Sequence, residues 1–263
     1  MQRIERAFFP RCKPHKLTQN AVLVCTWAAF ASQRNPAYTI LRRISYSVGY
    51  QQKGLQAGST MTGCTFVPVG GGDVNIQDIK PQGDDVDYGY VNIQTLNAYG
   101  QTLATYVYYG ADEWDDGSIA GWYDDDGLVD VTFAAGTGLW VAAPDNETTL
   151  TFSGKVPTSD VVVQLRAGST ATANVMPTGL PIQDILPAGD NVDYGYVNIQ
   201  TLNAYGQTLA TYVYYGADEW DDGSVAGWYD DDGLVDVTFP AGQGLWVAAP
   251  DAETTITIPA PEL

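Results

Sequence analysis

The chain has 263 residues, of which 31 are acidic and 12 are basic, so its formal net charge is −19 at pH 7. Positions 54–263 carry 30 of the acidic residues and only three of the basic ones. A surface with this charge repels phosphate groups, which argues against nucleic acid and anionic membrane surfaces as partners. Cations, cationic polymers and neutral sugars are the electrostatically compatible partners.

The amino-terminal segment has the features of a secretory signal peptide. Five basic residues precede an apolar run over 21–31, which ends in Ala29-Phe-Ala31, the small-x-small pattern of a signal peptidase site. We therefore predict a signal peptide over 1–31, a linker over 32–47 and a secreted or cell-surface protein. The run is shorter than the roughly 20 residues of a membrane span, so no transmembrane span is expected after leader removal. The alternatives are a mis-assigned start codon and a buried strand at the head of the first repeat.

The rest of the chain is one unit written twice. Residues 86–118 recur without a change at 192–224, an offset of 106. Tandem copies more often build an extended or multivalent surface than a single catalytic centre. We assign repeat 1 to 48–156, and repeat 2 with a short Pro-rich tail to 157–263.

Each repeat is predicted to be an all-β, sandwich or barrel-like unit of about seven strands, because short apolar stretches alternate with turn residues. A short helical turn is expected at 76–79, and Gly100 and Asp126-Gly127 are expected to form the turns of two hairpins. Repeat 2 is expected to begin with a strand at 161–165 and to end at Ile258. In repeat 1 the strands are expected, in chain order, at 48–55, 60–69, 91–96, 102–109, 122–123, 128–133, 139–143 and 148–152.

Four motifs occur in both repeats: Leu-x-Ala-Gly-Ser, Ile-Gln-Asp-Ile, Gly-Trp-Tyr-Asp-Asp-Asp-Gly and Phe-x-x-Gly-x-Gly-Leu-Trp-Val. This signature resembles a poorly characterised class of secreted bacterial β-repeat surface proteins, whose repeats carry an aromatic residue after a Gly-x-Gly turn. The resemblance covers 48–156 and 161–258, and its motifs consist of turn and packing residues. It implies export and a β-fold, and it assigns no catalytic residue.

Clustered carboxylates suggest a Ca²⁺ site in each repeat, because hard oxygen ligands on flexible loops suit this ion. Asp124-Asp-Asp-Gly127 matches only the last few positions of an EF-hand loop, so that motif is excluded. A solvated acidic loop that keeps the protein soluble is the first alternative, and catalytic carboxylates are the second. The candidate metal ligands are Asp112, Glu113, Asp115, Asp116, Asp124, Asp125, Asp126 and Asp130, with Asp218, Glu219, Asp221, Asp222, Asp230, Asp231, Asp232 and Asp236 in repeat 2.

Aromatic side chains form the second candidate surface. Alternation along 103–108 sends two tyrosines to one face of a strand. If that face meets solvent, the rings suit stacking on sugars or docking of a protein partner; if it meets a second sheet, they belong to the core. Trp122 and Trp140 are expected in the core. The candidate ligand-binding residues are Tyr106, Tyr108, Trp114, Tyr212, Tyr214 and Trp220.

Signals for an enzyme are few. His15, the one histidine, lies in the predicted leader, so a mature chain lacks a His-based triad. Gly136-Thr-Gly138 opens a strand rather than a helix, which argues against nucleotide binding. After leader removal Cys64 is left without a disulfide partner and is expected to be a buried apolar group; its counterpart in repeat 2 is Asn174. We predict no catalytic and no cofactor-binding residue, and no enzymatic activity.

The sequence therefore predicts a secreted or cell-surface structural or adhesion protein made of two acidic β-repeats, with Ca²⁺ as a candidate structural ion. Its expected partner is an extracellular polymer, a carbohydrate or a protein. The alternative is a tandem carbohydrate-binding module that uses exposed Tyr and Trp rings. A glycoside hydrolase is the third hypothesis.

Overall fold

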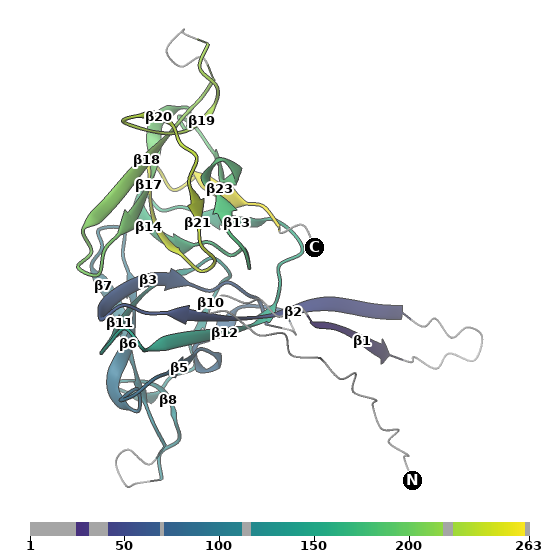
Figure 1. Ribbon diagram of the computed structural model, residues 1–263, viewed down its shortest axis with the longest axis vertical. Helices are drawn as coiled ribbons and strands as arrows, with labels where there is room; N and C mark the ends of the chain where they lie inside the picture. Colours follow the sequence, from purple (N-terminus) through teal and green to yellow (C-terminus); the bar gives the residue numbers. More distant parts are fainter. Residues whose placement is uncertain (1–24, 32–41, 69–70, 112–116, 218–222, 261–263) are drawn as a thin grey trace.

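The computed structural model describes residues 25–31, 42–68, 71–111, 117–217 and 223–260, and this part of the chain is all-β (Figure 1). Its helical elements are two single-turn 3-10 segments, η1 (Ile76–Asp78) and η2 (Ile182–Asp184). The predicted helical turn at 76–79 is therefore confirmed. Within the described residues, no helix has the length and hydropathy that a membrane crossing requires.

Repeat 1 and the segment before it form three sheets. The largest has six strands in the order β3-β11-β6-β7-β8-β9, the second has the order β1-β2-β12-β5, and β10 pairs with β4. The strand bounds are β1 (Cys25–Ala31), β2 (Arg42–Gly54), β3 (Gly58–Gly63), β4 (Val74–Asn75), β5 (Lys80–Gln82), β6 (Tyr88–Leu96), β7 (Thr102–Tyr109), β8 (Gly121–Asp124), β9 (Gly127–Leu128), β10 (Thr132–Phe133), β11 (Gly138–Ala143) and β12 (Thr149–Lys155).

Repeat 2 contains a six-stranded sheet with the corresponding strand order, β14-β22-β17-β18-β19-β20. A three-stranded sheet, β13-β23-β16, and the pair β15-β21 complete it. The bounds are β13 (Val161–Gln164), β14 (Gly168–Ala173), β15 (Leu180–Pro181), β16 (Leu186–Ala188), β17 (Tyr194–Leu202), β18 (Thr208–Tyr215), β19 (Gly227–Asp230), β20 (Gly233–Leu234), β21 (Thr238–Phe239), β22 (Gly244–Ala249) and β23 (Thr255–Ile258).

The predicted hairpin around Gly100 is confirmed as β6 and β7, whereas the second predicted hairpin is only partly correct. The turn at Asp126-Gly127 forms, but residues 128–133 do not return as one strand, because β10 leaves the sheet and pairs with β4. The Gln77 side chain lies where this pairing ends. Its amide donates to the carbonyls of Trp122 (2.9 Å) and Val129 (2.8 Å). The Trp122 carbonyl also accepts from the Val129 backbone amide, whereas the Val129 carbonyl is bonded to this side chain instead of to a neighbouring strand.

The segment that contains the end of the predicted signal peptide is a strand in this structure. β1 pairs antiparallel with the first half of β2, and Figure 1 shows this pair projecting from the body of the molecule. Residues 1–24 and 32–41 lie outside the described residues. The leader and the secreted location therefore stay predictions.

Each repeat has its own hydrophobic cluster, and the two clusters hold equivalent residues. Trp122 and Trp228 are fully buried at their centres, which confirms the core prediction for Trp122. The same prediction is wrong for Trp140, which is only partly buried. Trp140 follows the buried Leu139 in β11, so strand alternation turns it to the outer face of the sheet.

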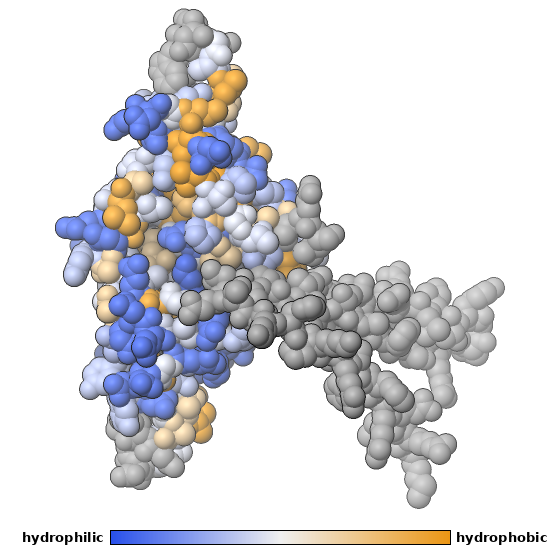
Figure 2. All heavy atoms as spheres, in the orientation of Figure 1, coloured by the Kyte–Doolittle hydropathy of each residue, from blue (hydrophilic) through white to orange (hydrophobic). Residues whose placement is uncertain are grey.

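The molecular surface in Figure 2 is largely hydrophilic over repeat 1, in the lower half of the view, and has hydrophobic areas over repeat 2. Several apolar side chains of repeat 2 are more than half exposed, among them Leu209, Leu186 and Val225. Leu209 also lines a cavity between the repeats.

The Gln77 side chain gives a test of the fold. Its amide oxygen accepts from the Trp122 backbone amide in addition to the two bonds above. Gln77→Ala removes three hydrogen bonds to part-buried backbone groups. We therefore expect the free energy of unfolding, measured by urea titration, to fall by about 1–3 kcal/mol. Asp78→Ala, an exposed change one residue away, is the control. Equal stability of the two variants would contradict this role.

Candidate binding site between the repeats

The two repeats pack through the same surface, related by an approximate twofold axis. The Thr62 hydroxyl donates to the Gly242 carbonyl (2.8 Å), and the equivalent Thr172 hydroxyl donates to the Gly136 carbonyl (2.7 Å). This contact of repeat 1 with repeat 2 is thus repeated with the roles of the two repeats exchanged. This is the isologous geometry of a symmetric homodimer, realised within one chain.

Two glycines allow the sheets to approach this closely. A Cβ atom at Gly138 would lie 2.5 Å from the Thr172 amide nitrogen, and one at Gly244 would overlap the side chain and backbone of Met61. Gly138 begins β11 and Gly244 begins β22, so the two positions are equivalent. Only residues without a side chain fit where the two backbones cross.

The hairpin loop of each repeat reaches across the axis to the tryptophan of the other. Gly100 lies against the Trp246 ring and Gly206 against the Trp140 ring, so that an added Cβ atom at either glycine would be 3.9 Å from the ring. The loops are held internally, because the Asn97 side-chain oxygen accepts from the amides of Tyr99 and Gln101. The loops and the tryptophans of the two repeats are therefore brought together at one boundary.

A groove of about 430 Å³ lies between these loops, and the repeats contribute equivalent residues to it. Tyr99 and Tyr205 are 85% and 86% exposed, while both tryptophans are partly buried at its lining. Twelve residues line the groove, and none of them is charged: Gln94, Leu96, Tyr99, Gly100, Thr102 and Trp140, with Gln200, Leu202, Tyr205, Gly206, Thr208 and Trp246.

The polar groups of the groove are oriented by their neighbours. The Gln94 amide oxygen accepts from the Thr102 hydroxyl (3.2 Å), and its nitrogen donates to the Asn92 side chain (3.3 Å). Gln200 makes the equivalent bonds in repeat 2. One amide hydrogen and one lone pair of each glutamine remain available to a ligand. The groove therefore offers aromatic rings beside fixed, neutral hydrogen-bonding groups.

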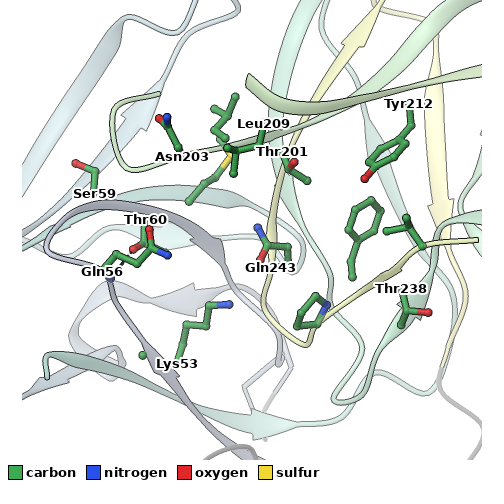
Figure 3. Close-up of a pocket in the computed structure, with 16 residues that line it drawn as sticks. Lys53, Gln56, Ser59, Thr60, Thr201, Asn203, Leu209, Tyr212, Thr238 and Gln243 are labelled. Carbon is green, nitrogen blue, oxygen red and sulfur yellow. Dashed lines mark hydrogen bonds between the residues drawn. The ribbon is translucent and has the colours of Figure 1, made fainter. Parts of the chain in front are cut away.

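A second cavity, of about 560 Å³, lies beside the groove at the same boundary (Figure 3). Lys53 of β2 enters it from repeat 1, and Tyr212, Thr238 and Gln243 enter it from repeat 2. Burial lowers the pKa of Lys53 from its usual 10.5, because the ammonium loses hydration. Burial and the charge of Asp230 raise the pKa of Tyr212, so this phenol stays protonated and can donate.

The structure describes half of the predicted Ca²⁺ ligands, and these are exposed. Asp124 forms a turn by accepting from the Asp126 amide (2.9 Å), and Asp130 accepts from the Asn75 side chain. Among the described residues, no three carboxylate, cysteine or histidine side chains are grouped so that they could hold a metal ion. The other candidates, Asp112, Glu113, Asp115, Asp116, Asp218, Glu219, Asp221 and Asp222, lie outside the described residues, so the Ca²⁺ prediction stays a prediction.

For the predicted tyrosine face, the structure shows the core alternative. Tyr106 and Tyr108 are 8% and 7% exposed, Tyr212 is 9% exposed, and Tyr214 is partly buried. Tyr108 packs edge-on against Trp122, with ring centroids 5.3 Å apart. Rings in this position have no free face for stacking on a sugar, although Tyr106 and Tyr212 still contribute to the linings of cavities. Trp114 and Trp220 lie outside the described residues.

The edges of the tyrosines nevertheless meet some of the predicted aspartates. Tyr106 and Asp124–Asp126 line a surface cavity of about 530 Å³. Tyr212 and Asp230–Asp232 line its counterpart in repeat 2. Residues that were expected in two different sites, one for a metal and one for a ligand, thus line one cavity in each repeat.

Cys64 is fully buried and unpaired, which confirms its prediction as a buried apolar group. Burial, with a smaller contribution from the charge of Asp73, raises the pKa of its thiol to about 12. The thiolate is therefore scarce at neutral pH, and the sulfur is a packing group. Asn174, its counterpart, donates to three backbone carbonyls instead.

Sequence reasoning missed the groove residues. Trp140 was expected in the core, and nothing in one repeat shows that its loop will lie against the tryptophan of the other. The glycine at position 100 was an available signal for a loop tip, and its φ in the structure is 76°. In comparisons with protein-family models, curated proteins and solved structures, no match to this chain was found.

The crossing glycines give a second test. Gly138→Ala and Gly244→Ala each place a methyl group against the backbone of the other repeat, so we expect each to destabilise the protein by about 1–3 kcal/mol in denaturant titrations. Gly54→Ala is the control, because a Cβ atom there has no atom within 4 Å. Wild-type stability of both crossing variants would show that the repeats do not pack in this way.

Proposed function

We propose that the protein is a secreted or cell-surface adhesion protein that holds a neutral carbohydrate in the groove between its repeats. The observation that carries the proposal is the composition of the groove, in which Tyr99, Trp140, Tyr205 and Trp246 stand beside the amides of Gln94 and Gln200. Aromatic rings suit the apolar faces of sugar rings, and amides suit their hydroxyls.

Charge supports a neutral ligand. None of the lining residues of the groove carries a charge, and positions 54–263 are strongly acidic. This field repels polyanions at a distance, and the groove has no cation to compensate. Its lining also has no carboxylate, so hydrolysis by a carboxylate pair is not part of the proposal.

Ca²⁺ enters the proposal only as a structural ion of the acidic segments, whose described carboxylates are not among the residues that line the groove. A ligand that binds only the folded state raises its melting temperature by mass action. On this hypothesis excess Ca²⁺ raises the melting temperature of the leaderless protein relative to chelator, and Mg²⁺ does not. Identical melting in all three conditions would reduce these carboxylates to solvated charge.

Removal of the two exposed rings tests the groove directly. In Tyr99→Ala/Tyr205→Ala we expect the affinity for neutral polysaccharides to fall by about two- to tenfold per ring, because each substitution removes a ring that stacks on the sugar. Tyr90→Ala/Tyr196→Ala removes two other exposed tyrosines outside the groove and is the matched control. Affinity electrophoresis in gels that contain β-glucan, xylan or mannan provides the measurement.

The outcomes separate the hypotheses. Loss of retardation in the groove variant alone supports the proposal, and equal loss in both variants points to a different aromatic surface. If none of these polymers retards the wild-type protein, the carbohydrate proposal is contradicted and a purely structural role is the remaining hypothesis. Calorimetry with an oligosaccharide of the retarding polymer should give one site per chain, since the two repeats form one groove; two sites would indicate independent modules.

A further inference from the structure

The twofold symmetry of the repeat boundary is broken where Gly136 and Gly242 meet the opposite repeat. On one side, Gly136 packs against three valines, with an added Cβ atom at this glycine 3.3 Å from Val163, 3.4 Å from Val175 and 3.6 Å from Val161. Gly242 is its equivalent on the other side. An added Cβ atom at Gly242 would lie 3.1 Å from the Gln51 side chain and 3.4 Å from the Thr65 side chain.

All three valines have polar counterparts. At the offset of 110 that relates these segments, Val161 corresponds to Gln51, Val163 to Lys53 and Val175 to Thr65. Gln51 and Thr65 are 6% and 0% exposed. Among the described residues, neither the Gln51 side-chain oxygen nor the Thr65 hydroxyl has a hydrogen-bond partner. Buried polar groups without partners destabilise a fold, so the apolar solution of repeat 2 is the more stable one.

One member of this polar set, Lys53, is among the residues that line the cavity of Figure 3, whereas Gln51 and Thr65 are not. Gln51 and Lys53 lie on the same face of β2, because they are two positions apart in a strand. Lys53 lines the cavity, and its amino group points into the space between the repeats. None of the sixteen lining residues is acidic. Among the described residues, Lys53 thus has no counterion in the lining of its cavity, although the chain is rich in carboxylates.

From this arrangement we propose that the cavity at Lys53 is a second binding site, which takes a carboxylate-bearing ligand of the size of one acidic sugar. The ammonium of Lys53 binds the carboxylate as a charge-assisted donor. The ligand hydroxyls meet the surrounding neutral groups, among them Tyr212, Thr238 and Gln243. The site occurs once per chain, because Val163 stands in place of the lysine on the other side.

Two further observations agree with this assignment. Burial lowers the pKa of Lys53, as expected for a cation that lacks a partner, and a bound carboxylate would supply that partner. The site also shares only Leu202 with the lining of the neutral groove. Binding at Lys53 is therefore separable from the proposed function, and Tyr99→Ala/Tyr205→Ala should retain it.

Glucuronate is the probe, and glucose is its neutral counterpart of the same ring size. With the full chain, we expect calorimetry to show binding of glucuronate and much weaker binding of glucose. In Lys53→Val the affinity for glucuronate should fall about tenfold or more, because a charged hydrogen bond is lost. This substitution installs the residue that repeat 2 carries at the equivalent position, so the fold should accept it.

Lys80→Gln is the control for net charge, because Lys80 is exposed and lies outside the cavity. Unchanged affinity in this variant supports a local role of Lys53. Equal losses in Lys53→Val and Lys80→Gln would overturn the proposal in favour of a general charge effect. Equal binding of glucuronate and glucose by the wild-type protein would overturn it as well.

A triple variant tests whether the polar set serves binding at the expense of stability. Gln51→Val/Lys53→Val/Thr65→Val copies the apolar side of the boundary. We expect a higher melting temperature than wild type, together with loss of glucuronate binding. A folded triple variant that melts below the wild-type protein, or that binds glucuronate with unchanged affinity, would contradict the proposal.

Discussion

The close approach of the two repeats at Gly138 and Gly244 is the constraint on which the rest of the architecture depends. A side chain at either position would meet backbone atoms of the other repeat. Because the backbones cross here, Thr62 and Thr172 reach carbonyls across the boundary. The same approach places each hairpin loop over the tryptophan of the other repeat. Both cavities at the boundary are consequences of this packing, since each is lined from both repeats.

The two cavities at the boundary differ in how far their lining residues are repeated in the two halves of the chain. Ten of the twelve residues that line the groove belong to 86–118 or to its unchanged copy at 192–224, so the groove is symmetric. The second cavity takes several residues from 49–66, where the repeats differ, and it is asymmetric. The sequences of the two repeats are thus identical where equivalent residues line the groove. They differ at the second cavity, where Lys53 of repeat 1 corresponds to Val163 of repeat 2.

Much of the local structure was predictable from the sequence. The strand pattern, the turn at 76–79 and the hairpin at Gly100 follow from alternation and turn chemistry, which act between near neighbours in the chain. The number of strands did not follow, because β10 pairs with β4 outside the large sheet and the Gln77 side chain, 52 residues away in the chain, bonds the Val129 carbonyl. Whether the tyrosine face of β7 is buried or exposed could not be predicted either, because it depends on where other elements pack against that strand.

The groove lay beyond sequence reasoning for a similar reason. Tyr99 and Trp140 are 41 positions apart in one repeat, and the contact that joins them to one site is made with the other copy. Periodicity describes each strand separately and contains no information on how two identical units face each other. A binding role for Lys53 could not be predicted from the sequence either. Its difference from Val163 matters only because the two residues lie at equivalent places of a boundary that the fold defines.

The twofold arrangement also changes what duplication means for binding. Two independent modules on one chain would gain avidity, because the second binding event is intramolecular. Here both copies are used to build a single groove, so one chain offers one neutral site. What the copies provide instead is preorganisation, since the loops are fixed by Asn97 and Asn203 and the amides by Thr102 and Thr208. A ligand then meets side chains that are already ordered, which lowers the entropic cost of binding. Avidity for a polymer must accordingly come from several chains on one surface, as the proposed role in adhesion requires.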